Sequence, residues 1–341
     1  MNKRKNRFGA SIAVLLAVLL VSGCAGGSGG TGKATGAAAP EPSSSSAGNG
    51  EQLQKIRYSP LSGVSGLAVR FGAEKGFFKE EGLDVEFITT KNAIEGLTSK
   101  DVDVADVATT TAIIAAGKGA PIKIVSSMFR TKGPFYLIAA PGINSVEELK
   151  GKKVGAAVFG SGLDVYTQTI LNKHGLQKED VAYLANGTQE AAYASLTSGQ
   201  VDATIIHEPF ASLAEISGTG KLLAKGWDYL PNFHTGVLAA RSDFIENNPE
   251  LLEKLLRAYF KSQEYAKSHL DEYKAYFKQN VKVDEKAIDG AFEREDVLWE
   301  NNPDVDLNAL KETQQIQVDL GFQDRVYDVD QILDLRFIPK N

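Results

Sequence analysis

From residue 55 onward, apolar and polar positions follow two alternating patterns. Short and nearly continuous apolar runs, typical of buried strands, occupy four segments: 55–59, 83–88, 101–108 and 121–129. Between these runs, apolar residues recur at helical spacing, which predicts helices over 65–82, 92–99 and 109–119. Strands that alternate with helices in this way predict an open, largely parallel sheet flanked by helices.

A second series of the same kind follows. Its strands are predicted at 152–158, 181–185, 200–207 and 221–226, and its helices at 145–151, 160–175, 188–199 and 208–218. One more strand at 236–241 precedes a mostly helical C-terminal part, whose longest pattern covers 248–279. Because the chain is long enough for two lobes, the predicted fold class is α/β, with a mostly parallel sheet flanked by helices in each lobe.

One phrase occurs in both series. LTSKDVDVAD (97–106) and LTSGQVDATI (196–205) share Leu, Thr, Ser, Val and Asp at matching positions. We interpret the two copies as the same helix, turn and strand, placed once in each lobe. Ligands of open α/β sheets bind beyond the carboxyl ends of the strands. A cleft is therefore expected between the two strand ends, and a small molecule bound there would draw the lobes together.

The first 23 residues have the layout of an export signal. A cationic start, MNKRKNR, precedes an apolar run that is too short to span a bilayer and then small residues that lead to Cys24. Cys24 is the only cysteine in the sequence. Its place after Val-Ser-Gly resembles the lipobox of bacterial lipoproteins, which implies cleavage before Cys24 and a diacylglycerol on its sulfur; the plain alternative is a free thiol. Residues 24–54, with almost no apolar residue larger than alanine, are expected to form a disordered tether about 30 Å long.

Composition narrows the choice of partner and chemistry. The formal charge of −6 becomes −10 once the four basic residues of the signal are removed, which argues against nucleic acid or anionic lipid as a partner. A single cysteine excludes an intramolecular disulfide, a Cys-rich zinc site and a Cys-x-x-Cys redox pair. The four histidines show no His-x-x-x-His spacing. No cofactor and no metal are expected, and an enzyme is not expected.

The order of several short motifs carries a family resemblance. They are LAV…EKGFF…EGLDV (67–85), VDV (102–104), AAGKGAPIK (115–123), EELKGKKV (147–154) and GQVDA…EP (199–209). Together they resemble the nitrate, sulfonate and taurine solute-binding proteins of ABC importers, a family that also includes proteins binding pyrimidine precursors of thiamine. The resemblance covers about residues 55–260. It implies a type 2 periplasmic-binding fold, with the middle lobe inserted between two crossovers.

The resemblance also implies boundaries and partners. Crossovers are expected near 138–142 and 235–239, with the segments divided as follows: signal 1–23, lipidated Cys24 and tether 24–54, first lobe 55–139 plus 238–341, and second lobe 140–237. The expected protein is a monomer, lipid-anchored at the extracytoplasmic face of the cell membrane, that passes its solute to a permease and an ATPase.

The solute itself stays open. A sulfonate-, taurine- or nitrate-like anion or zwitterion is one reading, and an aminopyrimidine, thiamine precursor or aromatic acid is another. Two other classes of function are alternatives. One is a pyrimidine-synthesising enzyme of the same fold, although this chain lacks the Cys-rich segment of such enzymes, and the other is a surface sensor or adhesin. In this fold helix N-termini point into the cleft, where free N–H groups favour anions. Candidate ligand contacts there are Ser62, Ser65, Thr109, Thr110, Gly160, Ser161 and Gly162; the alternative is that these are ordinary helix caps.

His207 and Glu208 follow the second copy of the repeated phrase directly. As ligand contacts, His207 would donate a hydrogen bond and Glu208 would accept one from an amino or ring N–H group. The alternative is a satisfied strand-end histidine and a glutamate that complements a helix dipole. A buried glutamate would repel a bare anion, which favours a ligand that also carries a donor or a positive group. Further candidates that could be either ligand contacts or structural residues are Asp164, Arg130, His234, Phe159 and Trp227.

Overall fold

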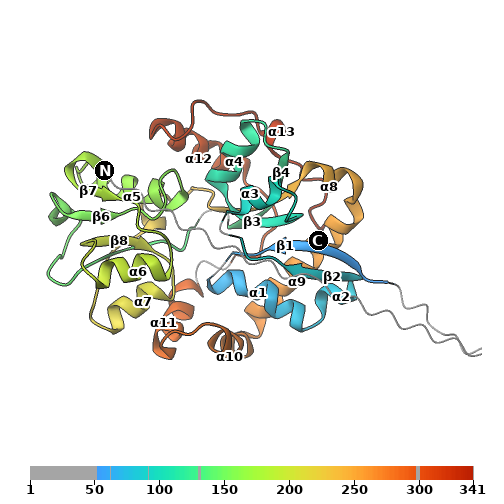
Figure 1. The fold of residues 1–341 in the computed structure, drawn as a ribbon, viewed down its shortest axis with the longest axis horizontal. Coiled ribbons are helices and arrows are strands. Elements are labelled where there is room, and N and C mark those ends of the chain that lie inside the picture. The colour runs from blue at the N-terminus through green and yellow to red at the C-terminus, as the bar shows by residue number, and fades with distance from the viewer. Residues whose placement is uncertain (1–51, 62, 91, 130–131, 297–299, 341) are drawn as a thin grey trace, which may run out of the picture. The chain divides into compact units, whose positions relative to one another are not determined.

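The computed structural model describes residues 52–340 except 62, 91, 130–131 and 297–299 (Figure 1). The predicted signal, the acylated Cys24 and almost all of the tether lie outside the described residues. So do the candidate contacts Ser62 and Arg130. The described residues belong to one compact unit.

The first sheet runs in the order β2 (Leu83–Phe87), β1 (Gln54–Ser59), β3 (Val104–Ala108), β10 (Gly236–Arg241) and β4 (Ile122–Phe129). β1 pairs in parallel with β2 and β3, whereas β10 is antiparallel to both β3 and β4. The predicted strands are therefore present, and the strand that returns late in the chain runs against the others.

The second sheet repeats this plan. Its order is β7 (Ala182–Leu184), β6 (Lys153–Gly155), β8 (Ala203–Ile206), β5 (Tyr136–Ala139) and β9 (Lys221–Lys225). β6 is parallel to β7 and β8, and β5 is antiparallel to β8 and β9. Each sheet is thus mostly parallel with one reversed strand in its interior.

The reversed strands differ from the boundaries expected from the sequence. β5 had no predicted strand and fell on the first-lobe side of the boundary after residue 139, but it pairs within the second sheet. Gly236 and Val237 of β10 fell on the second-lobe side, but they pair within the first sheet. A four-residue apolar run predicts that a segment is buried. It does not predict which sheet the segment joins, because that is decided by pairing with residues far along the chain.

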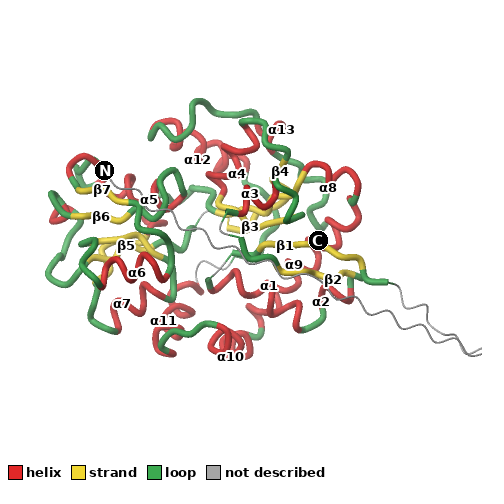
Figure 2. Tube along the Cα trace, in the orientation of Figure 1, coloured by secondary structure: helices red, strands yellow, loops and turns green. Residues whose placement is uncertain are grey.

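Helices connect the strands and cover the sheets (Figures 1 and 2). In the first series they are α1 (Val64–Glu74), α2 (Phe77–Glu80), α3 (Ala93–Thr98) and α4 (Thr109–Gly117), and in the second α5 (Gly162–Lys173), α6 (Glu190–Thr197) and α7 (Phe210–Ile216). The helix predicted over 145–151 is a single 3-10 turn, Glu147–Leu149.

The C-terminal part is helical, as predicted. It contains α8 (Ser242–Asn247), α9 (Pro249–Ser268), α10 (Leu270–Asn280), α11 (Glu285–Glu295), α12 (Leu307–Asp319) and α13 (Val329–Ile332). The long pattern over 248–279 splits into α9 and α10 because the backbone of His269 leaves the helical range, at φ −122° and ψ 52°.

Both faces of the first sheet are buried. Ile56, Tyr58 and Leu238 pack with α8 and α9 on one face, and Ala105, Val107 and Val237 pack with α3 and α4 on the other. The second sheet is likewise covered by two separate apolar clusters. Burial on both faces explains why the strands read as continuous apolar runs and not as an alternation.

The repeated phrase has one local structure in both copies. Asp103 accepts a hydrogen bond from the backbone N–H of Arg57 (2.9 Å), and Asp202 accepts one from that of Lys153 (2.8 Å). In return, each aspartate donates its own N–H to the carbonyl of the same neighbour. Both copies also end their helix with a residue at positive φ, Lys100 (67°) and Gly199 (71°). The aspartate therefore fixes the register between two parallel strands, once in each sheet.

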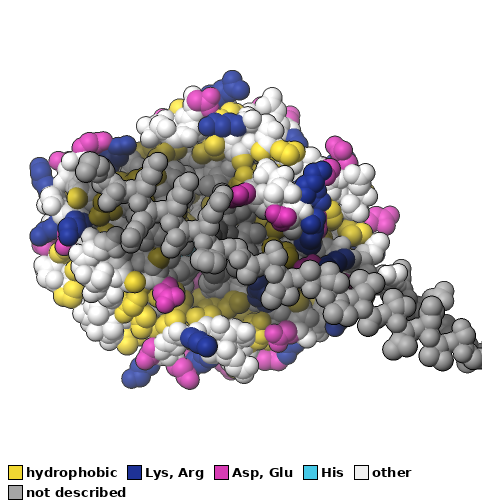
Figure 3. Space-filling model, viewed as in Figure 1, with side chains coloured by type: hydrophobic (Ala, Val, Ile, Leu, Met, Phe, Trp, Pro, Cys, Tyr) yellow, Lys and Arg dark blue, Asp and Glu magenta, His cyan; other side chains and the backbone are white. Residues whose placement is uncertain are grey.

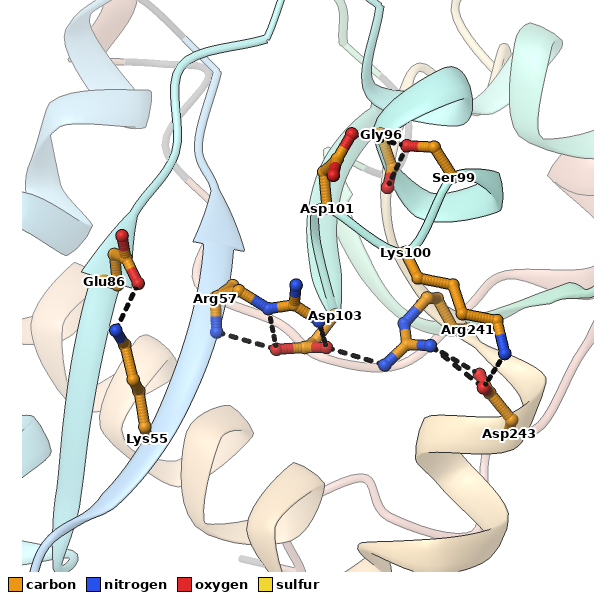
Figure 4. A network of polar contacts seen from close by, with 10 residues as sticks. All are labelled: Lys55, Arg57, Glu86, Gly96, Ser99, Lys100, Asp101, Asp103, Arg241 and Asp243. Atoms are coloured by element: carbon orange, nitrogen blue, oxygen red, sulfur yellow. Dashed lines mark hydrogen bonds and ion pairs between the residues drawn. The ribbon is translucent and has the colours of Figure 1, made fainter.

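Asp103 has an additional role that Asp202 lacks. Its carboxylate lies between two guanidinium groups, 2.7 Å from Arg57 Nη2 and 2.7 Å from Arg241 Nη2 (Figure 4). Arg241 also binds Asp243, which in turn binds Lys100. This network lies at the end of β10 and the start of β3. Ala108 and Gly236 lie at the other end of the same two strands.

Candidate ligand-binding cavity

A cavity of about 200 Å³ lies where the strand ends of the two sheets meet. The first sheet contributes the end of β3 and the start of β10, and the second contributes residues beside β5 and β8. The described lining is Leu61, Gly63, Val64, Ala108, Pro134, Phe135, Leu163, Thr188, Gln189, His207, Glu208, Thr235, Gly236 and Glu295. The cavity is thus mostly apolar, with a few polar groups, which is the general make-up of small-molecule sites.

Glu208 is held firmly at the cavity wall. Its carboxylate accepts hydrogen bonds from the Ser212 N–H (2.9 Å) and hydroxyl (3.0 Å), and it forms an ion pair with Arg294 Nη1 at 2.8 Å. Burial raises the pKa of Glu208, and Arg294 and Ser212 counteract part of that rise. Glu208 lies next to α7 and Arg294 lies on α11, so this pair joins the second sheet's helices to the C-terminal helices. No pattern in the sequence predicted a role for Arg294.

Glu295 is the second carboxyl group of the lining, and sequence analysis missed it. It is 7% exposed and ends α11. Burial raises its pKa well above the usual value, the charge of Glu208 raises it further, and Arg294 lowers it. A sequence signal was present: Glu295 continues the helical spacing of Ile288, Ala291 and Phe292, which are buried on one face of α11. A glutamate on an apolar helix face is the kind of exception that indicates function.

His207 is neutral at physiological pH. Burial lowers its pKa to about 4, although a hydrogen bond to the backbone of Pro134 raises it. Its ring packs edge-to-face on Phe135 with 4.8 Å between ring centroids. His207 therefore lines the cavity as an uncharged, aromatic group.

The N-termini of α4 and α5 lie close together. A Cβ on Gly162 would lie 3.9 Å from the hydroxyl oxygen of Thr110, which is 1% exposed and finds no hydrogen-bond partner among the described residues. Thr109 instead shares a hydrogen bond of 3.1 Å with Nδ1 of His234. These residues do not line the cavity but border it, next to Ala108 and Leu163. Their contact with a ligand stays a prediction.

The loop before α5 is braced from within. Asp164, 1% exposed, accepts hydrogen bonds from the Gly160 N–H (2.7 Å), Gln168 Nε2 (2.9 Å) and the Tyr183 hydroxyl (2.6 Å). Ser161 caps α5 by accepting from the Asp164 N–H at 3.4 Å. In this structure these groups are used by the loop itself, so their part in ligand contact also stays a prediction.

Three other candidates lie off the cavity lining or are only partly described. Phe159 is 57% exposed and stacks on Tyr183. Trp227 packs edge-to-face on Tyr136. Ser65 belongs to α1, directly after the lining residue Val64.

One lining residue has a strained backbone. Gln189 adopts φ 54° and ψ −124°, a region that costs a non-glycine residue about 1–3 kcal/mol. Such strain gathers at ligand sites because the surrounding structure holds it in place. Its position supports the assignment of the cavity as a functional site.

Other kinds of site are not evident in the part of the chain that the structure describes. His, Cys, Asp and Glu side chains do not gather there in a group that could hold a metal. The helices searched, all within the described residues, include none with the length and apolar character needed to cross a membrane. On the face in Figure 3, the described basic and acidic side chains are interspersed.

Solved structures show which fold this is. The nitrate-binding protein NrtA from Synechocystis PCC 6803 aligns with a TM-score of 0.70 at 15% identity, covering 84% of this chain and 87% of that one. The periplasmic aliphatic sulphonate binding protein SsuA from Escherichia coli aligns with a TM-score of 0.66 at 18% identity, covering 82% and 91%. The architecture is therefore that of the periplasmic-binding proteins, which confirms the predicted fold class.

The family model described as NMT1/THI5 like matches residues 67–273. The chain belongs to this family, as the motif order predicted. A candidate aliphatic sulfonates-binding protein of Bacillus subtilis (strain 168) is 28% identical over 86% of this chain and 90% of that protein. The 4-amino-5-hydroxymethyl-2-methylpyrimidine phosphate synthase THI13 of Saccharomyces cerevisiae is 27% identical over 56% and 60%. Relatives thus include both binding proteins and synthases.

Proposed function

We propose that the chain is the extracytoplasmic solute-binding protein of an ABC importer and that it captures a small organic solute in the cavity described above. The observation that carries the proposal is the joint lining: residues at the strand ends of both sheets face one cavity of about 200 Å³. This is below the roughly 300–1,000 Å³ of sites for drug-sized ligands, which favours a small solute. The named sulfonate- and nitrate-binding relatives support a transport role.

The proposal includes two lobes built on the two sheets. The chain passes from the first sheet to the second after β4 and returns before β10. We propose that the crossovers lie between β4 and β5 and between β9 and β10, a few residues before the 138–142 and 235–239 expected from the sequence. Rotation about these segments would open the cavity and let the solute enter.

The proposal also includes the lipid anchor at Cys24, supported by the lipobox-like sequence before it. Mass spectrometry of the mature N-terminus is expected to find Cys24 as the first residue, carrying a diacylglycerol. A Cys24→Ala variant should leave the membrane fraction with its fold unchanged, because the anchor would be its link to the bilayer. A mature wild-type protein that starts elsewhere contradicts the anchor and leaves the solute-binding role standing.

Solute binding is tested on the chain from residue 25 onward. Thermal-shift and calorimetric titrations use alkanesulfonates, taurine, nitrate, aromatic acids and aminopyrimidines. A bound solute at 100 times its Kd should add about 2.7 kcal/mol to the free energy of unfolding. Ala108→Leu places a larger side chain in the cavity and should weaken that binding at least tenfold. The control Ala182→Leu, at an exposed position on β7, should bind as the wild type does. No binding across the panel, or equal binding by Ala108→Leu, refutes the proposal.

A further inference from the structure

We propose that Glu295 determines the specificity of the cavity: it requires the solute to present an N–H donor, as an amine, an amidinium or an amino-substituted ring does, and it disfavours solutes that are anions only. The inference rests on the proposed function and names the class of solute. Glu295 would contact the solute directly.

The position of Glu295 is that of a ligand contact. It lines the cavity, is 7% exposed, and receives no hydrogen bond and no ion pair from the residues that the structure describes. Glu208, the other carboxyl of the lining, is in contrast satisfied by Ser212 and Arg294. A buried carboxyl group needs partners. For Glu295 the free space in front of it is where such a partner can bind.

The charges around Glu295 set the preference. Arg294, its neighbour on α11, is already shared between Glu208 and Glu215. The other titratable groups near Glu295 are Tyr136 on β5 and Tyr273 on α10, and both are neutral at physiological pH because burial raises their pKa. The lining given above contains no lysine and no arginine. Arg294 balances the charge of Glu208, so ionised Glu295 has no cation of its own in the described lining. A donor or a cation on the solute stabilises that ionised form, whereas a bare oxyanion opposes it.

A merely structural role does not explain this glutamate. Its helix position continues the stripe of Ile288, Ala291 and Phe292, where an apolar residue would pack without losing hydration. Keeping a carboxyl there weakens the fold, since burial disfavours its ionised form. Binding residues commonly carry such a stability cost.

The test compares probes that share a carbon skeleton and differ in the polar group: ethylamine with ethanesulfonate, and 4-aminopyridine with pyridine-4-sulfonate. Calorimetry on the chain from residue 25 onward is expected to show tighter binding of the amino member of each pair. Glu295→Gln should weaken that binding ten- to a hundredfold, the range for losing a hydrogen bond to a charged group. The control Glu293→Gln, exposed on the same helix, should change nothing. Glu295→Leu should abolish amine binding and raise the urea midpoint of the unliganded protein.

The outcomes separate the two proposals. Wild-type binding of the sulfonates in preference to the amines, or amine binding that Glu295→Gln leaves unchanged, overturns the specificity inference while the solute-binding function stands. Loss of stability in both Glu295 variants assigns the residue a structural role and overturns the inference as well. Absence of binding by every probe and by the whole earlier panel overturns the function and the inference together.

Discussion

Asp103→Ala is expected to lower the free energy of unfolding by about 3–5 kcal/mol, the range for removing one partner from a buried ion pair. Asp103 is 5% exposed and accepts four hydrogen bonds, three from Arg57 and one from Arg241. Its removal leaves the Arg57 backbone N–H without its acceptor and Arg241, whose side chain is 11% exposed, with Asp243 alone. The lower end of the range is expected because Arg57 is partly exposed and Arg241 keeps one carboxylate.

The pH dependence of this effect has a definite sign. Burial would raise the pKa of Asp103, but the hydrogen bonds and charges of Arg57 and Arg241 outweigh it and lower the pKa below the usual value. A carboxyl group with a lowered pKa stabilises the fold above its unfolded-state pKa of about 3.9 and loses that effect as the pH falls below it. The difference between wild type and Asp103→Ala should therefore stay constant from pH 8 to pH 5.

The second copy of the repeated phrase supplies the matched control. Asp202 accepts the backbone N–H of Lys153 in the same geometry but has no arginine partner in the described structure. Asp202→Ala should cost only about 1 kcal/mol, the value of one hydrogen bond. Urea unfolding of both variants measures the contrast. Equal losses of unfolding free energy in the two variants would show that the arginine network adds no stability beyond the hydrogen bond to the neighbouring strand that both aspartates make.

The elements of the fold could be predicted wherever a local pattern determines them. Strands buried on both faces, such as β3, appear as apolar runs, and α4 appears as a helical stripe. β5 was missed because its four apolar residues follow a proline and a glycine and pair with strands more than 60 residues later in the chain. The repeated phrase was correctly predicted to form equivalent structures. The hydrogen bonds by which its aspartates fix the register could not be predicted from the sequence, because the partners Arg57 and Lys153 lie on other strands.

Only the part of the candidate site that lies at a strand end could be predicted from the sequence. His207 and Glu208 directly follow a strand, so a rule about strand ends finds them, and both line the cavity. Glu295 and Arg294 come from a C-terminal helix whose place beside that strand end is set by tertiary packing of α11 against α7. From the sequence, Glu208 could be either a ligand contact or a residue that complements a helix dipole. In the structure Arg294 and Ser212 bind it, so among the described lining residues the carboxyl without such partners is that of Glu295.

Arg294→Met is expected to cost about 3–5 kcal/mol of unfolding free energy at pH 8, because it leaves the buried carboxylate of Glu208 without its counter-charge. The side chain of Glu208 is fully buried, whereas that of Arg294 is 21% exposed. The variant also loses the ion pair with Glu215 and the contact of the guanidinium with the Tyr136 ring. As a control, Arg336→Met removes a pair with Asp334 in which the arginine side chain is 74% exposed, and it should cost at most about 1 kcal/mol. Urea unfolding measures both.

The stability loss of Arg294→Met should depend on pH between 8 and 5, whereas that of Asp103→Ala should not. Burial already raises the pKa of Glu208 in the wild type while Arg294 lowers it, so removing the arginine must raise that pKa further. An acid whose pKa is raised on folding destabilises the folded state once the pH exceeds its unfolded-state pKa of about 4.3. This destabilisation grows with pH until the folded-state pKa is reached, so a higher folded-state pKa gives a larger loss of stability. The deficit of Arg294→Met should accordingly shrink as the pH falls from 8 to 5. Adding Glu208→Gln to Arg294→Met removes the unpaired charge and should recover much of the stability at pH 8. A deficit that is independent of pH and unrelieved in the double variant would mean that Arg294 acts through packing and not through its charge.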